Sequence, residues 1–408
     1  MTLPKYLLLA ALPATLLSCG GGGAATPKAA VLTPAQRLEK RLRAIVADSC
    51  FMYGHHDDTA YGYTWNNQDI PEAGNQDTTG RSDVKDVCGD YPGVINWDLG
   101  MLECAEVMPL KDNNGPLSGE KACLTPMNQR GGRNLDDVPF SRIAKEIVKH
   151  DARGGINTIS WHPLSPVSGK NSWDNTDSTV VRKIVTPGTK EHIIFQRWAM
   201  NCADFIGALR DAEGNRIPVV FRPWHEHTGS WFWWGKDLCT VDEYKALWKL
   251  TRAIFDAEGI DNVLWCYSPD RIGSLEEYTE RYPGDEYVDI LGADVYMFGM
   301  EEGIADYLSR ARMQLQAATD LSRKNGKLVT LSETGHETVP LANWYDEILL
   351  PLCKEFPIAY VCVWRNAYPA LKPNHFYAPY AGHSSVPGFL NFYNDPKTLF
   401  CKETANYK

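Results

Sequence analysis

Apolar positions cluster in eight short runs after residue 32, and most of these runs are rich in β-branched and aromatic residues. Strands that are apolar along nearly their whole length are typical of a parallel sheet covered on both faces. The pattern therefore predicts eight buried strands, at residues 51–54, 94–99, 156–161, 217–221, 262–267, 288–295, 327–332 and 359–363.

Longer segments with the apolar spacing of amphipathic helices separate these runs, at residues 140–150, 192–210, 241–258, 303–323 and 343–354. Eight strands with helical crossovers predict an α/β fold of the (β/α)8 TIM-barrel type. A doubly wound open sheet is the alternative, but no glycine-rich GxGxxG loop follows the first run. Barrels of this length are ordinary single domains, so we expect one domain over residues 37–408.

The amino terminus follows another pattern. Lys5 precedes an apolar run, residues 6–17, which is too short to span a bilayer and is followed by Ser18 and Cys19. This is typical of a bacterial lipoprotein signal, and an ordinary secretory signal is the alternative. We expect a signal peptide over residues 1–18, a lipid on Cys19 and a flexible tether over residues 19–36. The expected location is the outer membrane, on its cell-surface or periplasmic face.

Net charge bears on the class of partner, and cysteine content bears on disulfides and structural metal sites. The formal net charge of -10 argues against nucleic acid and is compatible with a neutral substrate. Ten cysteines follow Cys19, so disulfides are expected in an exported chain, but the sequence does not show which residues pair. There is no CxxC pair of the kind that structural zinc sites use. Cys266 and Cys362 lie inside predicted strands, which suits small buried apolar residues.

Polar residues stand at or just after the carboxyl end of every predicted strand. In a barrel these ends meet on one face, where barrel enzymes place their active sites. The residues are, in strand order, His55 to Asp58, Asp98, His162, Arg222 with His225 and Glu226, Asp270, Asp294 with Tyr296, Glu333, and Trp364 to Asn366.

Glu226 and Glu333 are the candidate catalytic pair. A glycosidic bond is cleaved by one carboxylic acid that protonates the leaving oxygen and one carboxylate that attacks or directs water. The ends of the fourth and seventh strands can bring two such groups face to face. The tryptophans near Glu226 favour it as the acid, because an apolar environment raises a carboxyl pKa.

Strand alternation limits which neighbours can join this site. It places Arg222, Trp224 and Glu226 on one face and His225 on the other. If His225 also serves the site, regular strand geometry has to break near Pro223.

Four large aromatic residues, Trp231 to Trp234, follow the turn that begins at Thr228. Indole rings stack on the C–H faces of sugars, so such a cluster suits a polysaccharide cleft. Packing at the top of the barrel is the alternative. We expect one or two of the four to contact substrate, with Trp231 the best candidate.

A zinc-dependent hydrolase is a further alternative. His225 and His227 form an HxH pair that His162, Asp270 and Asp294 would complete as a metal site. This pattern is short and common by chance, and the same strand carries a glutamate that a metal site does not need. We therefore expect no metal and no cofactor.

Several motifs together resemble a known family. SDVKDVCGDYPGVINWDLG, GGINTISWH, RPWHE with GSWFWWG, SETG and VWRNA follow one another from about Gly54 to the carboxyl terminus. They resemble glycoside hydrolase family 26, chiefly its β-mannanases, which are retaining enzymes of the clan A barrels. The commonest pattern, HEMNGSWFWWG, is HEHTGSWFWWG here, and the changes at His227 and Thr228 bear on the leaving-group subsites.

The resemblance implies that Glu226 is the general acid/base and Glu333 the nucleophile. It implies that Tyr296 positions the nucleophile and that Trp364 lies under the cleaved sugar. It also implies that Arg222 and His225 belong to the substrate-binding site. It places His162 and Arg365 on the non-reducing side and Trp231 and Trp173 on the leaving-group side.

The resemblance thus implies an enzyme that hydrolyses β-1,4-mannosidic bonds in mannan or manno-oligosaccharides with retention. Together with the lipoprotein signal, we expect a monomer that is held at the membrane by its lipid. A xylanase or mixed-linkage β-glucanase on the same fold is one alternative, because the glutamate pair does not identify the sugar. A non-catalytic glycan-binding lipoprotein is another, although both glutamates are present.

Overall fold

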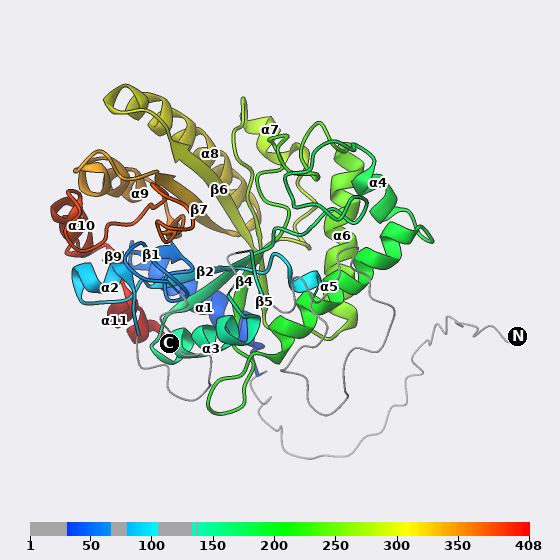
Figure 1. The fold of residues 1–408 in the computed structure, drawn as a ribbon, viewed down its shortest axis with the longest axis horizontal. Helices are drawn as coiled ribbons and strands as arrows, with labels where there is room; N and C mark the ends of the chain where they lie inside the picture. The colour runs from blue at the N-terminus through cyan, green and yellow to red at the C-terminus, as the bar shows by residue number, and fades with distance from the viewer. Residues whose placement is uncertain (1–30, 67–79, 105–132, 136–137) are drawn as a thin grey trace, which may run out of the picture. The chain divides into compact units, whose positions relative to one another are not determined.

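Eight parallel strands close into a barrel in the computed structural model, which describes residues 31–66, 80–104, 133–135 and 138–408 (Figure 1). Each strand pairs with the next in sequence, and β1 pairs with both β2 and β8, which closes the ring. The strands are β1 (Phe51–His56), β2 (Val94–Asp98), β3 (Ile156–Ser160), β4 (Val219–Arg222), β5 (Val263–Tyr267), β6 (Ile290–Met297), β7 (Leu328–His336) and β8 (Ile358–Val363). The predicted (β/α)8 fold and all eight strand positions are confirmed.

Helices surround the barrel as the crossovers require. They are α2 (Asp83–Cys88), α3 (Phe140–Ala152), α4 (Val180–Val185), α5 (Lys190–Ala208), α6 (Val241–Ala257), α7 (Leu275–Glu280), α8 (Ile304–Asn325), α9 (Leu350–Lys354), α10 (Val386–Tyr393) and α11 (Cys401–Thr404). Short 3-10 turns are η2 (Leu102–Cys104), η4 (Glu301–Gly303) and η6 (Ala405–Tyr407), and β9 (Thr398–Leu399) pairs with β1.

One predicted helix has a different form. Residues 343–354 were expected to be a single α-helix, but a π-helix, η5 (Trp344–Leu349), precedes α9. Pro351 has no N–H to donate to the carbonyl four residues back, and its ring crowds that carbonyl, so the preceding turn adopts wider hydrogen bonding.

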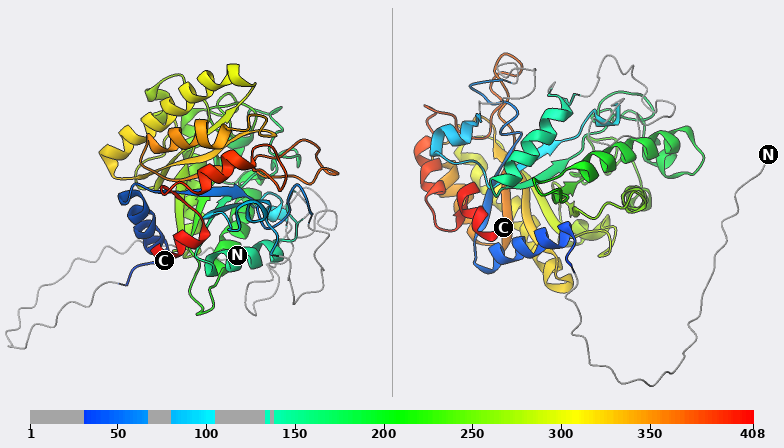
Figure 2. Two further views of the ribbon diagram at one scale, coloured as in Figure 1. Left: turned by 90° about the vertical axis from the view of Figure 1, so that its left-hand side faces the viewer. Right: turned by 90° about the horizontal axis from the view of Figure 1, so that it is seen from below.

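Helix α1 (Pro34–Ala47) is an element that the sequence analysis did not predict (Figure 2). Thr33 caps it through a capping box with Gln36. The buried side chains of α1 are Leu38, Leu42 and Ile45. They pack in one cluster with residues at the amino-terminal ends of the strands, such as Val94 and Ile156. The amino-terminal end of the barrel is thus covered by apolar side chains, and the opposite end is left for a site.

The cysteines are mostly unpaired. Cys104 is disulfide-bonded, and eight others in the described part of the chain are free thiols, including Cys266 and Cys362, which are buried as expected. Cys19 and the predicted signal peptide lie outside the described residues. Among the described helices, none is long and apolar enough to cross a membrane.

Candidate active site

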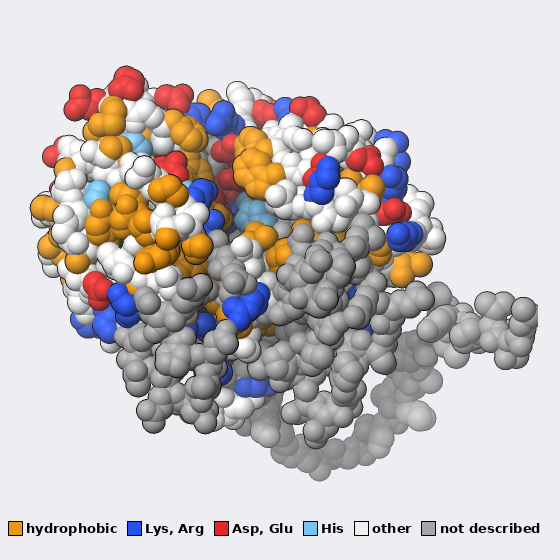
Figure 3. All heavy atoms as spheres, viewed as in Figure 1, with side chains coloured by type: hydrophobic (Ala, Val, Ile, Leu, Met, Phe, Trp, Pro, Cys, Tyr) orange, Lys and Arg blue, Asp and Glu red, His pale blue; other side chains and the backbone are white. Residues whose placement is uncertain are grey.

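A pocket of about 550 Å³ opens at the carboxyl ends of the strands. Acidic and histidine side chains lie at its base, and hydrophobic side chains lie at its edge (Figure 3). Nine of the sequence-predicted residues line it: His162, Trp173, His225, Glu226, Trp231, Tyr296, Glu333, Trp364 and Arg365. The tenth, Arg222, is fully buried beneath the pocket.

The chain leaves strand geometry immediately after β4. This break was expected if His225 and Glu226 both belong to the site. β4 ends at Arg222, and Trp224 and Glu226 have φ angles of 53° and 52°. Trp224 turns outward, where its Nε1 donates to Thr251 Oγ1 on α6 at 3.1 Å. His225 and Glu226 consequently both reach the pocket. Simple alternation predicted that Trp224 shares a face with Arg222 and Glu226. That prediction is wrong for Trp224.

Glu333 is aimed into the pocket by a bulge in β7. The register with β6 skips one residue, since Ala293 lies opposite Leu331 but Asp294 lies opposite Glu333. Such a bulge bends a strand and re-aims its side chains. Ser332, the extra residue, donates its hydroxyl to Asp294 Oδ1 at 2.6 Å.

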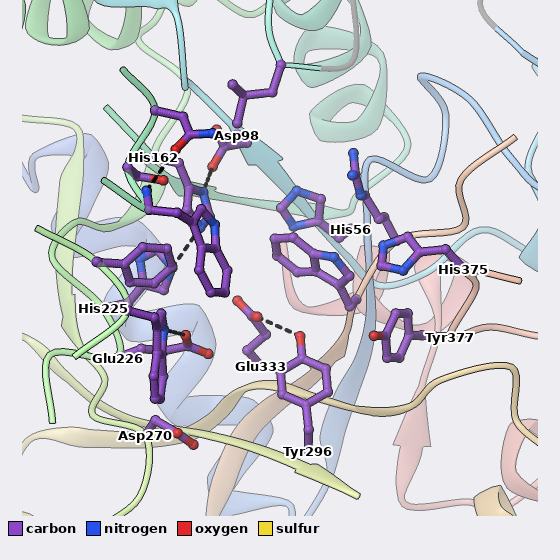
Figure 4. Close-up of a pocket in the computed structure, with 18 of the residues that line it drawn as sticks. His56, Asp98, His162, His225, Glu226, Asp270, Tyr296, Glu333, His375 and Tyr377 are labelled. Carbon is purple, nitrogen blue, oxygen red and sulfur yellow. Dashed lines mark hydrogen bonds and ion pairs between the residues drawn. The ribbon is translucent and has the colours of Figure 1, made fainter. Parts of the chain in front are cut away.

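Two donors hold the Glu333 carboxylate. Tyr296 donates its hydroxyl to Oε1 at 2.5 Å (Figure 4). The Arg222 guanidinium donates to Oε2, while its other nitrogen pairs with Asp294 at 2.6 Å. Burial lowers the pKa of Arg222, but the charges of Asp294 and Glu333 outweigh burial and hold that pKa well above its ordinary value. Glu333 thus has a fixed orientation and a permanent counter-charge.

Glu226 has a contrasting environment. Burial raises its pKa well above the ordinary value, and the negative charges of Glu333, Asp270 and Asp294 raise it further. Trp231 Nε1 donates to Glu226 Oε2 at 2.7 Å, which acts in the opposite direction. The indole can lie there because position 229 is glycine; a Cβ on Gly229 would be 2.1 Å from the ring. Glu226 is therefore the group suited to carry a proton.

Asp98, His162 and His225 form a hydrogen-bonded chain along one side of the pocket. Asp98 Oδ2 lies 2.5 Å from His162 Nδ1, and His162 Nε2 lies 3.0 Å from His225 Nε2. Burial acts to raise the pKa of Asp98, but the charge and hydrogen bond of His162 bring it below its ordinary value. Burial and the Arg222 charge lower the pKa of His225 well below its ordinary value, so this ring is neutral. Both nitrogens of His162 are engaged within the protein, which leaves its ring face and C–H edge for a ligand.

A second chain of hydrogen bonds supports Arg365 from the side of β1. Arg365 Nη1 donates to Tyr61 Oη at 3.1 Å, and that hydroxyl donates to Asp57 Oδ2 at 2.6 Å. His55, Asp57 and Asp58 belong to a polar network behind the pocket, which His56 joins from the pocket wall, and Asp57 has a left-handed φ of 52°.

The aromatic cluster divides between cleft and core. Trp231 is partly buried and Phe232 is buried, and both line the pocket, whereas Trp233 and Trp234 are completely buried. Trp173 is 60% exposed and packs edge-on against Phe232. Two of the four therefore line the pocket, and the expectation that one or two contact substrate stays a prediction.

The zinc alternative required His225 and His227 to converge, and they diverge. The His227 ring is buried between Tyr244 and Tyr267, with centroid distances of 4.5 and 4.8 Å, and it does not line the pocket. Within the described ranges, no group of three or more His, Cys, Asp or Glu side chains is arranged to hold a metal ion. The tight turn at Glu226 thus directs the two histidine rings to different surroundings.

Several pocket residues were not singled out as site residues from the sequence. Asp98 and His56 were visible only as polar strand ends, and Asp270 only as a polar strand end and a ligand of the zinc alternative. Others follow β6 or lie in the long connection after β8, and nothing in the local sequence pattern marks them; they include Phe298, Lys372, His375 and Tyr377.

Known proteins resemble this chain throughout the described barrel. The model of Glycosyl hydrolase family 26 matches residues 133–346. A GH26 β-mannanase structure from Bacteroides ovatus is 41% identical with a TM-score of 0.78, covering 90% of this chain and 95% of that one. A mannan endo-1,4-beta-mannosidase of Bifidobacterium adolescentis is 27% identical over 80% of this chain, and one of Bacillus subtilis is 35% identical over 40% of it.

The chain spans only 32% and 46% of the lengths of those two enzymes. The family match, however, covers more than half of the chain and includes the end of β4 and the whole of β7. The described barrel and the family model together show that the chain belongs to glycosyl hydrolase family 26.

Proposed function

We propose that this protein hydrolyses β-1,4-mannosidic bonds with retention of anomeric configuration. The observation that carries the proposal is the contrast between the two carboxyl groups in one pocket. Glu333 is paired with Arg222 and Tyr296, whereas burial and nearby negative charges favour the protonated form of Glu226. A carboxylate held by fixed donors suits a nucleophile, and a carboxyl group that keeps its proton suits a general acid. The names of the relatives support mannan as the substrate.

The proposed reaction takes two steps. Glu333 attacks the anomeric carbon while the bond to the leaving oxygen breaks, and the proton of Glu226 passes to that oxygen. Water then attacks the glycosyl–Glu333 ester, Glu226 takes the proton of this water, and the Glu333 carboxylate is released. Tyr296 and Arg222 keep the nucleophile oriented through both steps, and Trp364 offers an aromatic face to the sugar that reacts.

Hydrolysis of linear β-1,4-mannan by the purified protein tests the substrate. We expect mannan to be shortened, with little action on xylan or mixed-linkage β-glucan, and the product lengths over time distinguish internal from terminal cleavage. Cleavage of xylan or glucan in preference to mannan would contradict the assigned sugar. Binding of mannan without any cleavage would contradict enzymatic function.

Replacing Trp231 by phenylalanine is expected to move the pH profile of mannan hydrolysis. A hydrogen bond to an ionised carboxylate lowers its pKa, so losing the indole N–H should raise the pKa of Glu226 further. The descending limb of kcat/KM against pH reports the acid of the free enzyme, so this limb should move to higher pH. Trp173→Phe is the matched control, since Trp173 is exposed and packs against Phe232. An unchanged limb, or one at lower pH, would count against Glu226 as the acid.

A further inference from the structure

One wall of the pocket is formed by residues to which no role in substrate binding has been given above. Asp270 and Arg271 follow β5, Phe298 follows β6, and all three line the pocket. Figure 4 shows Asp270 next to Glu226, on the opposite side of Glu333 from His375 and Tyr377. This wall therefore adjoins the carboxyl group that would protonate the leaving oxygen.

Phe298 is held as an exposed platform. Its side chain is 61% exposed, although it stands between the buried Met297 and a sharp turn at Gly299, where φ is 76°. His336 Nε2 donates to the carbonyl of Gly299 at 2.8 Å and so ties this turn to the end of β7. A large aromatic side chain left exposed at the edge of a cleft is a feature of ligand-binding surfaces.

Asp270 and Arg271 place polar groups beside that ring. The Arg271 guanidinium lies 5.9 Å from the Phe298 ring centroid, and its Nε lies 3.5 Å from Asp270 Oδ2. Asp270 is only 6% exposed, and Arg271 supplies contacts to its carboxylate from both the backbone and the side chain. A carboxylate has about four acceptor positions, so Asp270 retains capacity for hydroxyl donors, and the guanidinium retains donors for hydroxyl acceptors.

We propose that Asp270, Arg271 and Phe298 form a subsite that binds a sugar residue of the leaving group. The C–H face of a pyranose ring would stack on Phe298 while its hydroxyl groups donate to Asp270 and accept from Arg271. The assignment to the leaving group rests on the proposed function, because it is the role of Glu226 as acid that defines this side of the cleft. The subsite lies on the same side as Trp231, which contacts Glu226 directly.

The test compares two substrates that differ in the leaving group. Mannotetraose places sugar residues on the leaving-group side, whereas β-mannobiosyl fluoride places only a fluoride there. The measured quantity is the ratio of kcat/KM for mannotetraose to kcat/KM for the fluoride. For Phe298→Ala we expect this ratio to fall about fivefold to tenfold, the usual size of an aromatic stacking contribution.

Met300→Ala is the matched control, because Met300 is also exposed (46%) and lies two residues further along but does not line the pocket. It should keep the wild-type ratio. Asp270→Asn provides a second variant; with each enzyme at its own pH optimum, its ratio should also fall.

The outcomes separate the two proposals. A wild-type enzyme that cleaves both substrates, together with an unchanged ratio in Phe298→Ala, would overturn the subsite alone. Equal losses on both substrates would also overturn it, since the residue would then shape the cleft as a whole. A wild-type protein that cleaves neither substrate would overturn the proposed function and this assignment with it.

Discussion

Replacing Glu333 by alanine is expected to lower kcat on β-1,4-mannan by about 10⁴-fold or more, because removal of a nucleophile abolishes the covalent route. The protein should still bind mannan, since the aromatic and polar walls of the pocket do not depend on this carboxylate. Arg222 keeps Asp294 as a partner in the variant, so we expect the barrel to remain folded. Initial rates and a mannan-binding isotherm on the same preparation provide the measurement.

Azide makes this first test specific to the role of Glu333. In the cavity left by the side chain, azide can attack the anomeric carbon directly, and a nucleophile variant should then form an α-mannosyl azide from an activated substrate. Glu355→Gln is the matched control, because Glu355 is a surface carboxylate paired with Arg312 at 2.7 Å, and it should retain wild-type activity. A Glu333→Ala enzyme with substantial activity and no azide product would contradict the assignment.

Replacing Glu226 by alanine is expected to produce a loss that depends on the leaving group. For mannan, whose leaving oxygen needs a proton, kcat/KM should fall by about 10²-fold to 10⁴-fold, the usual contribution of a general acid. For β-mannobiosyl fluoride, whose leaving group needs much less assistance, the first step should be affected far less and the glycosyl–enzyme should accumulate. The measurement compares both substrates and looks for a burst of fluoride release.

The product formed with azide distinguishes this variant from the first. Azide would attack the glycosyl–Glu333 ester from the face that water uses, which gives a β-mannosyl azide. An α product from the Glu226 variant, or equal losses on both substrates, would mean that the two glutamates have been assigned to the wrong roles. Glu226→Gln, which preserves side-chain volume beside Trp231, checks that the loss is chemical and not caused by repacking.

The pattern of apolar residues along the chain was sufficient to predict the barrel. The positions of residues at the strand ends were sufficient to predict the principal site residues. Parallel strands buried on both faces are continuously apolar, so their limits can be located from composition alone, and the polar residues at their carboxyl ends must then share one face. Glu226 and Glu333 were identified in this way, and the structure places both in one pocket with His162, Tyr296 and Trp364. The family resemblance added expected roles to these residues.

The orientation of the site residues depended on contacts between parts of the chain that are distant in sequence. The outward turn of Trp224, the separation of His225 from His227 and the bulge that aims Glu333 depend on contacts between strands and helices distant in sequence. The raised pKa of Glu226 likewise comes from burial and from charges on several different strands. The sequence by itself determined which side chains stand at the ends of the strands. Only the tertiary structure decided which way each one points, because orientation beyond the last regular strand residue is set by packing and not by alternation.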